Sequence, residues 1–299
     1  MLSVFFEVVL PVALIAIVGA VVGRWQGVPV RPVSTLVFFL FSPALVFHSL
    51  ATTEVPGDAA LRIVAVGVSM FLVMYAVATA WSLAFRHDRG LRSAFALSAV
   101  TPNTGNMGLP VALLAFGQAG FDVAVVNFVV GAVLAYSAGI VIASMADGGA
   151  SKALGAPFRY PVVYAAVAGV IVNVLNVDLP VTIEAPVETL AGAAVPVMLV
   201  VLGLQLHGAA SLAEVRDTTA ANAARLVLAP VLAWPVATAL GLDGVTRDTL
   251  VVLAGMPTAV IATVVAIEFN ARPDFVTRSV VLSTLLSMVT ATVLITIVR

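Results

Sequence analysis

The chain has no cysteine and little charge. With no cysteine among its 299 residues, it can form neither a disulfide framework nor a thiolate metal site. Only 10% of the residues are charged, against roughly 25% in soluble globular domains. The net charge is −1, so no excess of basic residues would attract nucleic acid. Disulfide-rich secreted domains and nucleic-acid-binding proteins are therefore excluded.

Apolar residues dominate instead. They make up 62% of the chain, and the mean hydropathy is +1.15. A helix needs about 20 such residues to cross a bilayer. Polar punctuation divides the chain into ten predicted membrane helices, at residues 4–23, 33–51, 61–85, 91–116, 119–145, 160–177, 184–206, 217–240, 247–270 and 274–298. The sequence thus predicts an all-α polytopic protein of the cell membrane, surrounded by the lipid bilayer and without a soluble domain.

The two halves of the chain resemble each other in the spacing of their prolines. Corresponding pairs are Pro11 and Pro161, Pro43 and Pro196, and Pro102 and Pro257. Each half holds five predicted helices, and five is an odd number. The second copy must therefore enter the membrane from the opposite side, as in many transporters. We expect a 5+5 inverted repeat of residues 1–147 and 158–299.

The distribution of Lys and Arg predicts the orientation. One side carries eleven of the fourteen, namely Arg24, Arg31, Arg86, Arg89, Arg92, Lys152, Arg159, Arg216, Arg225, Arg272 and Arg278. The other side carries Arg62, Arg247 and Arg299. Because basic loops stay in the cytoplasm, both termini are expected on the extracytoplasmic side.

Two predicted helices contain breaks at matching depth. The stretch TPNTGNMGLP at residues 101–110 interrupts the fourth, and AGMPTAV at residues 254–260 interrupts the ninth. Irregular backbone at mid-membrane depth is tolerated only where it is buried in protein or lines a wet cavity. The alternative interpretation of each break is a proline kink that serves packing alone.

If the two broken helices cross, their inner N-termini form a site for an anion. The candidate substrate-binding residues are Pro102, Asn103, Thr104, Gly105, Asn106, Met256, Pro257, Thr258, Ala259 and Val260. Pro43 and Arg225 are accessory candidates. Arg225 is expected either to snorkel or pack near the cytoplasmic surface or to attract anions, with no Lys or Arg at the depth of the crossing. No cofactor or metal is expected, and the proton and sodium both remain open as coupling ions.

Four motifs carry a resemblance to a known family. They are PNTGNMGLPVALLAFG, GMPTAVIATVVAIEFNARPDF, SPALVFHSL and VPVMLVVLGLQL, and together they resemble the auxin efflux carrier family nearly from end to end. The resemblance implies a fold similar to bile-acid symporters and sodium/proton antiporters. Helices one, two, six and seven would form a scaffold, and helices three to five and eight to ten a mobile transport domain. It also implies that Asn103 contacts the substrate carboxylate and that scaffold helices two and seven form a homodimer.

The sequence departs from the plant members on its third predicted helix. Gly67 and Phe71 stand where plant carriers have an acid and a lysine. The long cytoplasmic loop of many plant members is also missing, since only MADGGASKALGAPFR joins the fifth and sixth predicted helices, so the chain resembles a compact prokaryotic member. We expect an elevator-type efflux carrier of small organic anions, such as auxin-like, malate-like or malonate-like acids. An anion channel or a non-transporting carboxylate sensor is the alternative. An enzyme is excluded because the chain has no HExxH motif, no GxSxG motif and no paired membrane aspartates.

Overall fold

The computed structural model describes residues 1–53, 55–146, 161–205 and 214–299, and in these ranges the regular structure is helical. The proposed boundaries at residues 147 and 158 lie outside the described residues, as do Lys152, Arg159 and the ends at 160 and 206 of two predicted helices. An all-α protein is confirmed.

The first half contains eight α-helices and four short π-helical turns in the described residues. The α-helices are α1 (Leu2–Val4), α2 (Leu10–Gln26), α3 (Val30–Leu36), α4 (Ser42–Thr52), α5 (Gly57–Ala84), α6 (Arg89–Val100), α7 (Leu109–Leu134) and α8 (Ile140–Ser144). The π-turns are η1 (Phe5–Val9), η2 (Val37–Phe41), η3 (Thr104–Gly108) and η4 (Ala135–Gly139).

The second half is built in the same style. Its helices are α9 (Pro161–Val174), α10 (Val181–Gln205), α11 (Val215–Ala223), α12 (Ala229–Ala239), α13 (Gly244–Ala254), α14 (Val260–Glu268) and α15 (Pro273–Val298), with one π-turn, η6 (Ala224–Leu228), among its described residues.

Seven helical stretches in the described ranges are long and apolar enough to cross a membrane. They are Leu2–Gln26, Val30–Thr52, Gly57–Ala84, Thr104–Ser144, Val181–Leu204, Val215–Ala239 and Pro273–Val298, and Pro161–Val174 is a shorter apolar helix. The stretch of 41 residues from Thr104 bends at Gly117, whose φ of 67° and ψ of −158° are not helical. This bend lies between the predicted helices 91–116 and 119–145. A multi-pass membrane protein is confirmed.

Prolines explain four of the π-turns. The turns η1, η2, η3 and η6 each end two residues before a proline, at Pro11, Pro43, Pro110 and Pro230 respectively. A proline has no N–H to donate, and its ring crowds the carbonyl four residues earlier. The preceding turn widens in response, which is why these long helices change pitch at fixed points.

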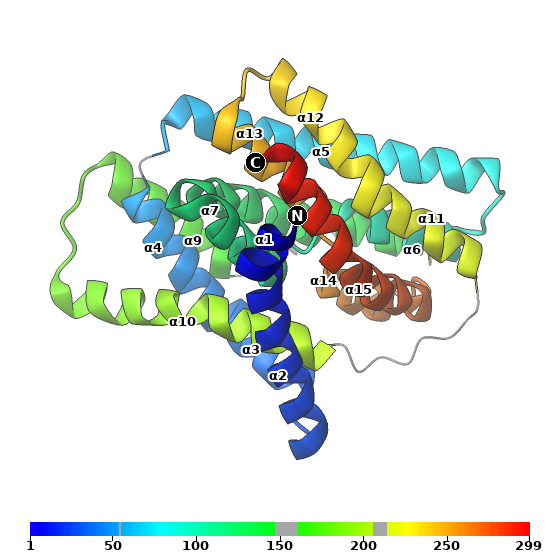
Figure 1. Ribbon diagram of the computed structural model, residues 1–299, viewed down its shortest axis with the longest axis horizontal. Helices are drawn as coiled ribbons and strands as arrows, with labels where there is room; N and C mark the ends of the chain where they lie inside the picture. Colours follow the sequence, from blue (N-terminus) through cyan, green and yellow to red (C-terminus); the bar gives the residue numbers. More distant parts are fainter. Residues whose placement is uncertain (54, 147–160, 206–213) are drawn as a thin grey trace.

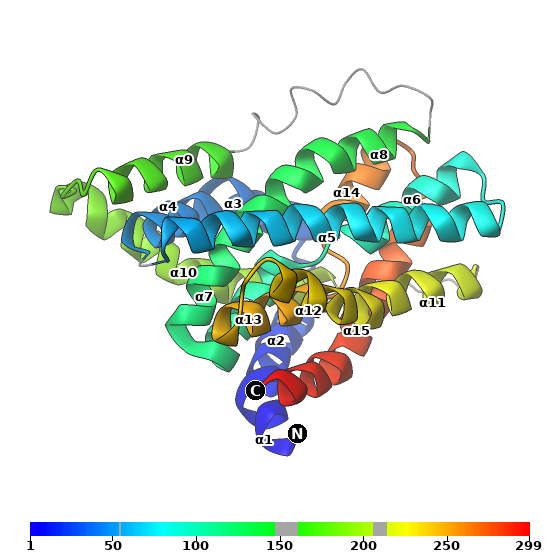
Figure 2. The ribbon, with the colours of Figure 1, turned by 90° about the horizontal axis from the view of Figure 1, so that it is seen from above.

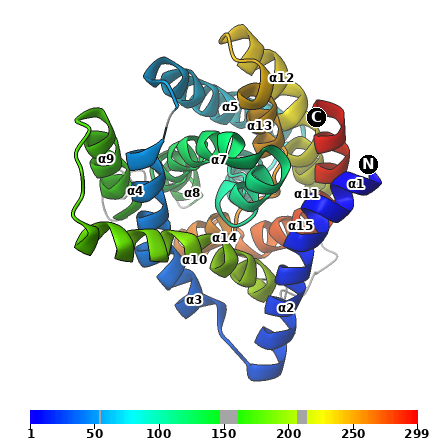
Figure 3. The ribbon, with the colours of Figure 1, turned by 60° about the vertical axis from the view of Figure 1, so that its left-hand side comes forward.

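The helices form two groups. In the first, which we call the four-helix group, α2 packs on α10, α10 on α4 and α4 on α9. The second, the crossing group, contains α5 to α7 and α11 to α15, which pack mainly on one another. Figure 1 shows the elements in sequence colours, and Figure 2 shows α9, α4 and α10 at one end of the molecule with α6, α8 and α11 at the other. In Figure 3, α7 lies at the centre, surrounded by α4, α5, α13 and α14.

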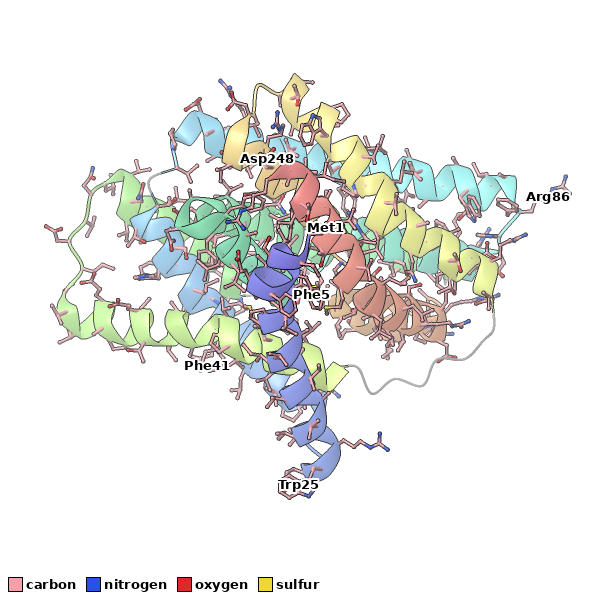
Figure 4. The ribbon with its side chains drawn as sticks, viewed as in Figure 1. Met1, Phe5, Trp25, Phe41, Arg86 and Asp248 are labelled. Atoms are coloured by element: carbon pink, nitrogen blue, oxygen red, sulfur yellow. The ribbon has the colours of Figure 1, made fainter. Side chains whose placement is uncertain are left out.

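Glycines allow close packing inside the four-helix group. A Cβ on Gly19 would lie 2.5 Å from the carbonyl oxygen of Val200, and one on Gly203 would lie 1.8 Å from that of Ala16. The helices α2 and α10 can therefore approach this closely only where both lack a side chain. Figure 4 shows Trp25 at the free end of α2, projecting away from the body of the protein, where its side chain is 80% exposed.

Candidate functional site

The two predicted breaks are real interruptions of helix. The first lies between the end of α6 at Val100 and the start of η3 at Thr104. The second lies between the end of α13 at Ala254 and the start of α14 at Val260. In both, a proline interrupts the donor pattern of the helix and the chain becomes extended for a few residues.

The extended residues of the two breaks pair with each other. Pro102 and Thr258 form an isolated antiparallel bridge. Asn103 N–H donates to the Pro257 carbonyl at 2.7 Å, and Ala259 N–H donates to the Thr101 carbonyl at 2.8 Å. These bonds satisfy backbone groups that would otherwise be unpaired deep inside the protein, so each break stabilises the other.

Thr258 fixes the second break to its neighbours. Its hydroxyl donates to the Ser98 carbonyl at 2.9 Å, and its backbone N–H donates to the Ser283 hydroxyl at 3.1 Å. The residue is fully buried. Both of these donors are therefore engaged in holding α6, α14 and α15 together.

The oxygen and the nitrogen of the Asn103 side-chain amide differ in their hydrogen bonding. Its Oδ1 accepts from the Asn106 N–H at 3.2 Å and so caps the helix that follows. A backbone N–H needs an acceptor, so this bond also determines which end of the amide is oxygen. Its Nδ2 has no hydrogen-bond partner among the described residues, although Asn103 is only 4% exposed. An unpaired buried amide donor is costly, and a ligand acceptor would satisfy it.

A cavity opens beside this amide, with about 750 Å³ of space between protein atoms, part of it continuous with the outside. We call it the first cavity. Residues 102–106 line it at the start of η3, and residues 259–261 line it at the start of α14. The first turn of a helix has N–H groups without helical partners, and it carries the positive end of the dipole. Two such ends face one cavity here.

The other walls of the first cavity come from both helix groups. Phe38, Ser42, Val162 and Met198 belong to the four-helix side, while Phe128, Gly131, Ala132, Ala135 and Tyr136 belong to α7 and η4. None of the described residues around the cavity is charged. The Ser42 hydroxyl is buried, and no described residue forms a hydrogen bond with it. The cavity thus has an apolar body and a polar end.

Seven of the ten predicted substrate-binding residues line this cavity: Pro102, Asn103, Thr104, Gly105, Asn106, Ala259 and Val260. Three others, Met256, Pro257 and Thr258, do not line it, and neither do the accessory candidates Pro43 and Arg225. The prediction missed Ser42 and Tyr136. Both are polar groups within otherwise apolar helices, and this signal was visible in the sequence.

Arg225 is where the sequence prediction needs correction. The sequence predicts that Arg225 snorkels or packs near the cytoplasmic surface, or attracts anions, with no Arg or Lys at the depth of the crossing. Its side chain is instead 3% exposed. Its Nη1 donates to the Ala99 carbonyl at 2.7 Å and its Nη2 to the Ala254 carbonyl, both at the ends of helices that lead into the breaks. The side chain is drawn inward because two unpaired helix carbonyls lie there.

Arg225 borders a second cavity on the other side of the crossing, with about 540 Å³ of space between protein atoms, part of it continuous with the outside. Gly67, Phe71 and Asn127 line it as well. Gly67 packs closely on α7, since a Cβ there would lie 2.8 Å from Cγ1 of Val130. Gly67 and Phe71 thus form an uncharged part of the wall, and Arg225 is the one charged residue among the described residues that line this cavity.

Other charged side chains of the described residues gather away from both cavities. Asp217 lies 3.2 Å from Nε2 of buried His87. Arg272 pairs with Asp88 and with Glu214, each at 2.5 Å. These contacts connect the α5–α6 turn with the starts of α11 and α15. They hold the ends of the crossing group together.

Comparison with known proteins agrees with this architecture. A profile of a family described as membrane transport protein matches residues 4–155 and 150–295. The chain is 29% identical over 290 residues to an "Uncharacterized transporter" of Methanothermobacter thermautotrophicus, with 95% of each chain covered. It is 27% identical over 282 residues to a "Putative malonate transporter" of Rhizobium meliloti, covering 89% of this chain and 86% of the relative. The chain therefore belongs to the membrane transport protein family, which includes the auxin efflux carriers, and it is a membrane transporter and not an enzyme.

Proposed function

We propose that the protein is a secondary carrier that binds small organic anions with their carboxylate at the polar end of the first cavity. The observation that carries this proposal is the meeting of two helix N-termini and the unpaired Nδ2 of Asn103 at that end. Backbone N–H groups, an amide donor and two positive dipole ends suit an anion. A cation would meet no carboxylate among the residues that line the cavity.

The apolar walls set the substrate class. Phe38, Phe128, Val162 and Met198 would contact the organic body of the ligand. The name of the Rhizobium meliloti relative supports a malonate-like acid, and the aromatic walls suit auxin-like acids as well. The direction we propose is efflux, in keeping with the family resemblance.

The mechanism we propose is an elevator. The first cavity lies between the four-helix group and the crossing group, so sliding one group along the other would carry the site across the membrane. We propose ten spans in two inverted sets of five, and counting each broken helix as one span gives that number among the described helices. The four-helix group corresponds to the scaffold and the crossing group to the mobile domain.

The proposed orientation places both termini outside the cytoplasm, in the cell membrane. The N- and C-terminal ends lie near each other in Figures 1 and 2, which supports a common side. Trp25 and Arg24 at the free end of α2 suit the cytoplasmic interface, where Trp and basic residues concentrate. Pairing of two copies through α4 and α10 follows from the family resemblance.

Counterflow in liposomes tests the carrier. Purified protein is reconstituted with unlabelled malonate inside, and labelled malonate, malate or an aromatic acetic acid is added outside. A carrier exchanges one for the other, so label accumulates transiently against its own gradient. A channel would only equilibrate the label, and a sensor would admit none. Either result would reject the proposal.

A further inference from the structure

Arg225 joins the two helix ends that the substrate does not face. Its guanidinium donates to Ala99 in the last turn of α6 and to Ala254 in the last turn of α13. These are the C-terminal ends of the two half-helices at the crossing. The N-terminal ends of the other two half-helices line the first cavity. The crossing therefore separates positive helix ends from negative ones.

The positive and negative charges at the crossing can be compared. Each helix end carries roughly half an elementary charge, so two C-terminal ends contribute about one negative charge. Arg225 contributes one positive charge, because a guanidinium keeps its proton at neutral pH. No salt bridge found among the described residues includes Arg225, so the helix ends are its counter-charge there. What remains is about one positive charge at the N-terminal ends, which matches one carboxylate.

Arg225 acts on the substrate through the crossing. Pro102, Thr104 and Gly131 line both cavities, so the first break forms the wall between them. Arg225 lines only the second cavity. Because Arg225 is buried, its charge is screened little by solvent. Its electric field therefore acts on an anion on the other side of the wall without direct contact. Arg225 is therefore a positioning residue, which acts on the bound anion through its charge and does not touch it.

Arg225 also occupies the oxygens that a coupling cation would use. In transporters with broken helices, sodium binds unwound carbonyls and half-helix C-termini. Here the Ala99 and Ala254 carbonyls accept from Arg225, and the Thr101 and Pro257 carbonyls accept from backbone N–H groups of the opposite break. Four carbonyl oxygens of the crossing are thus already engaged.

We propose that Arg225 is a built-in cation of the crossing, which neutralises both helix C-termini, allows a carboxylate to bind at the N-termini, and takes the place of a bound metal cation. The inference rests on the proposed carboxylate site. It predicts that substrate binding needs the positive charge of Arg225 and needs no sodium.

The test measures binding by calorimetry in detergent, with the tightest-binding acid from a panel of malonate, malate and an aromatic acetic acid. Wild-type protein is compared with Arg225→Gln, Arg225→Lys and the control Arg62→Gln, in sodium chloride and in choline chloride. Arg62 is a matched control because its guanidinium also donates to a backbone carbonyl, that of Gly241 at 3.1 Å, at an exposed site.

We expect Arg225→Gln to bind about 10- to 100-fold more weakly, the range for losing a charge-assisted interaction. Arg225→Lys should recover most of this loss, because lysine keeps the charge although it cannot bridge two carbonyls equally well. Wild type and Arg62→Gln should bind alike, with the same affinity in both salts. The difference between the Lys and Gln variants separates charge from packing, which both variants disturb.

Three results would overturn the inference: equal affinity of Arg225→Gln and wild type, Lys and Gln variants equally weak, or wild-type binding that requires sodium. The sodium comparison uses wild-type protein, so it decides the matter even if the Gln variant does not fold. If wild-type protein binds no acid of the panel, the proposed function itself fails and this inference fails with it.

Discussion

At the scale of single residues, the two ends of the Asn103 amide do different work. Its Oδ1 caps the helix that begins at Thr104, and its Nδ2 is the unpaired donor beside the first cavity. Asn103→Ala removes both. We expect carboxylate binding to weaken by about 1 to 3 kcal/mol, as for a lost hydrogen bond to a charged group. Thermal stability should also fall, by about 0.5 to 2 kcal/mol for the lost cap.

Asn103→Asp separates these two effects. Aspartate keeps the capping oxygen, so the helix start remains satisfied. It also places its own carboxylate at the positive helix ends and competes with the substrate for them. We expect anion binding to disappear while thermal stability exceeds that of Asn103→Ala. If calorimetry showed wild-type affinity in either variant, the substrate carboxylate would not bind at Asn103.

Asp88 links stability to pH at the end of the crossing group. Its Oδ1 accepts from the Leu91 N–H at 2.9 Å, and this bond, with Arg272 nearby, holds the pKa of Asp88 below its ordinary value. A lowered folded pKa means that the ionised form stabilises the fold at neutral pH, and that this contribution is lost as the pH falls through the folded value.

We therefore expect Asp88→Ala to lower the free energy of unfolding by about 0.5 to 2 kcal/mol at pH 7. The gap to wild type should shrink as the pH falls below the ordinary pKa of aspartate. Thermal unfolding in detergent at several pH values measures this. Asp88→Asn, which keeps the capping oxygen but not the charge, should lie between the two. A gap that grows on acidification would show that Asp88 is not ionised in the folded protein.

At the scale of the helix, Pro230 sets the direction of Arg225. Arg225 lies in the π-turn Ala224–Leu228, which ends two residues before Pro230. In Pro230→Ala the missing donor returns, and the turn can close to regular α-helix. A π-turn contains one residue more than an α-helical turn, so this change rotates the residues before it by about 100° around the helix axis. The guanidinium should then leave the Ala99 and Ala254 carbonyls, and binding should weaken as in Arg225→Gln.

Pro235→Ala is the matched control for this change. Pro235 lies inside α12 of the same span, and no π-turn in the described structure ends two residues before it. Its replacement should leave carboxylate affinity as in wild type. Equal affinity of Pro230→Ala and wild type in the calorimetric assay would show that the π-turn does not position Arg225.

Helix breaks were predictable because their cause is local. Pro102 and Pro257 lack N–H donors wherever the rest of the chain lies, so the sequence placed both breaks within a few residues. Four of the π-turns follow from prolines too, but widening and kinking of a helix have the same local pattern, and sequence alone does not separate them. The caps and pairings at the breaks required the structure, because they join residues far apart in the chain.

At the scale of the whole molecule, the missed features are long-range ones. The partners of Arg225 lie 126 and 29 residues away in sequence, and the partner of the Thr258 hydroxyl lies 160 residues away. Depth in the membrane, counted along one helix, gave the wrong surroundings for Arg225. The count assumed that a long side chain follows the shortest route to water. The guanidinium of Arg225 instead donates hydrogen bonds to two helix carbonyls on neighbouring segments.

The division into two helix groups makes a prediction for the moving protein. The chain has no cysteine, so a single introduced thiol reports without background. Ala132→Cys places one on α7 at the first cavity, and Ala143→Cys places one at a fully buried position of α8 as a control. In sealed vesicles, an elevator exposes the cavity to each side in turn. We expect a membrane-impermeant thiol reagent to label Ala132→Cys from either face, with bound carboxylate changing both rates, and to leave Ala143→Cys unlabelled. Labelling of Ala132→Cys from one face only, under all substrate conditions, would contradict alternating access.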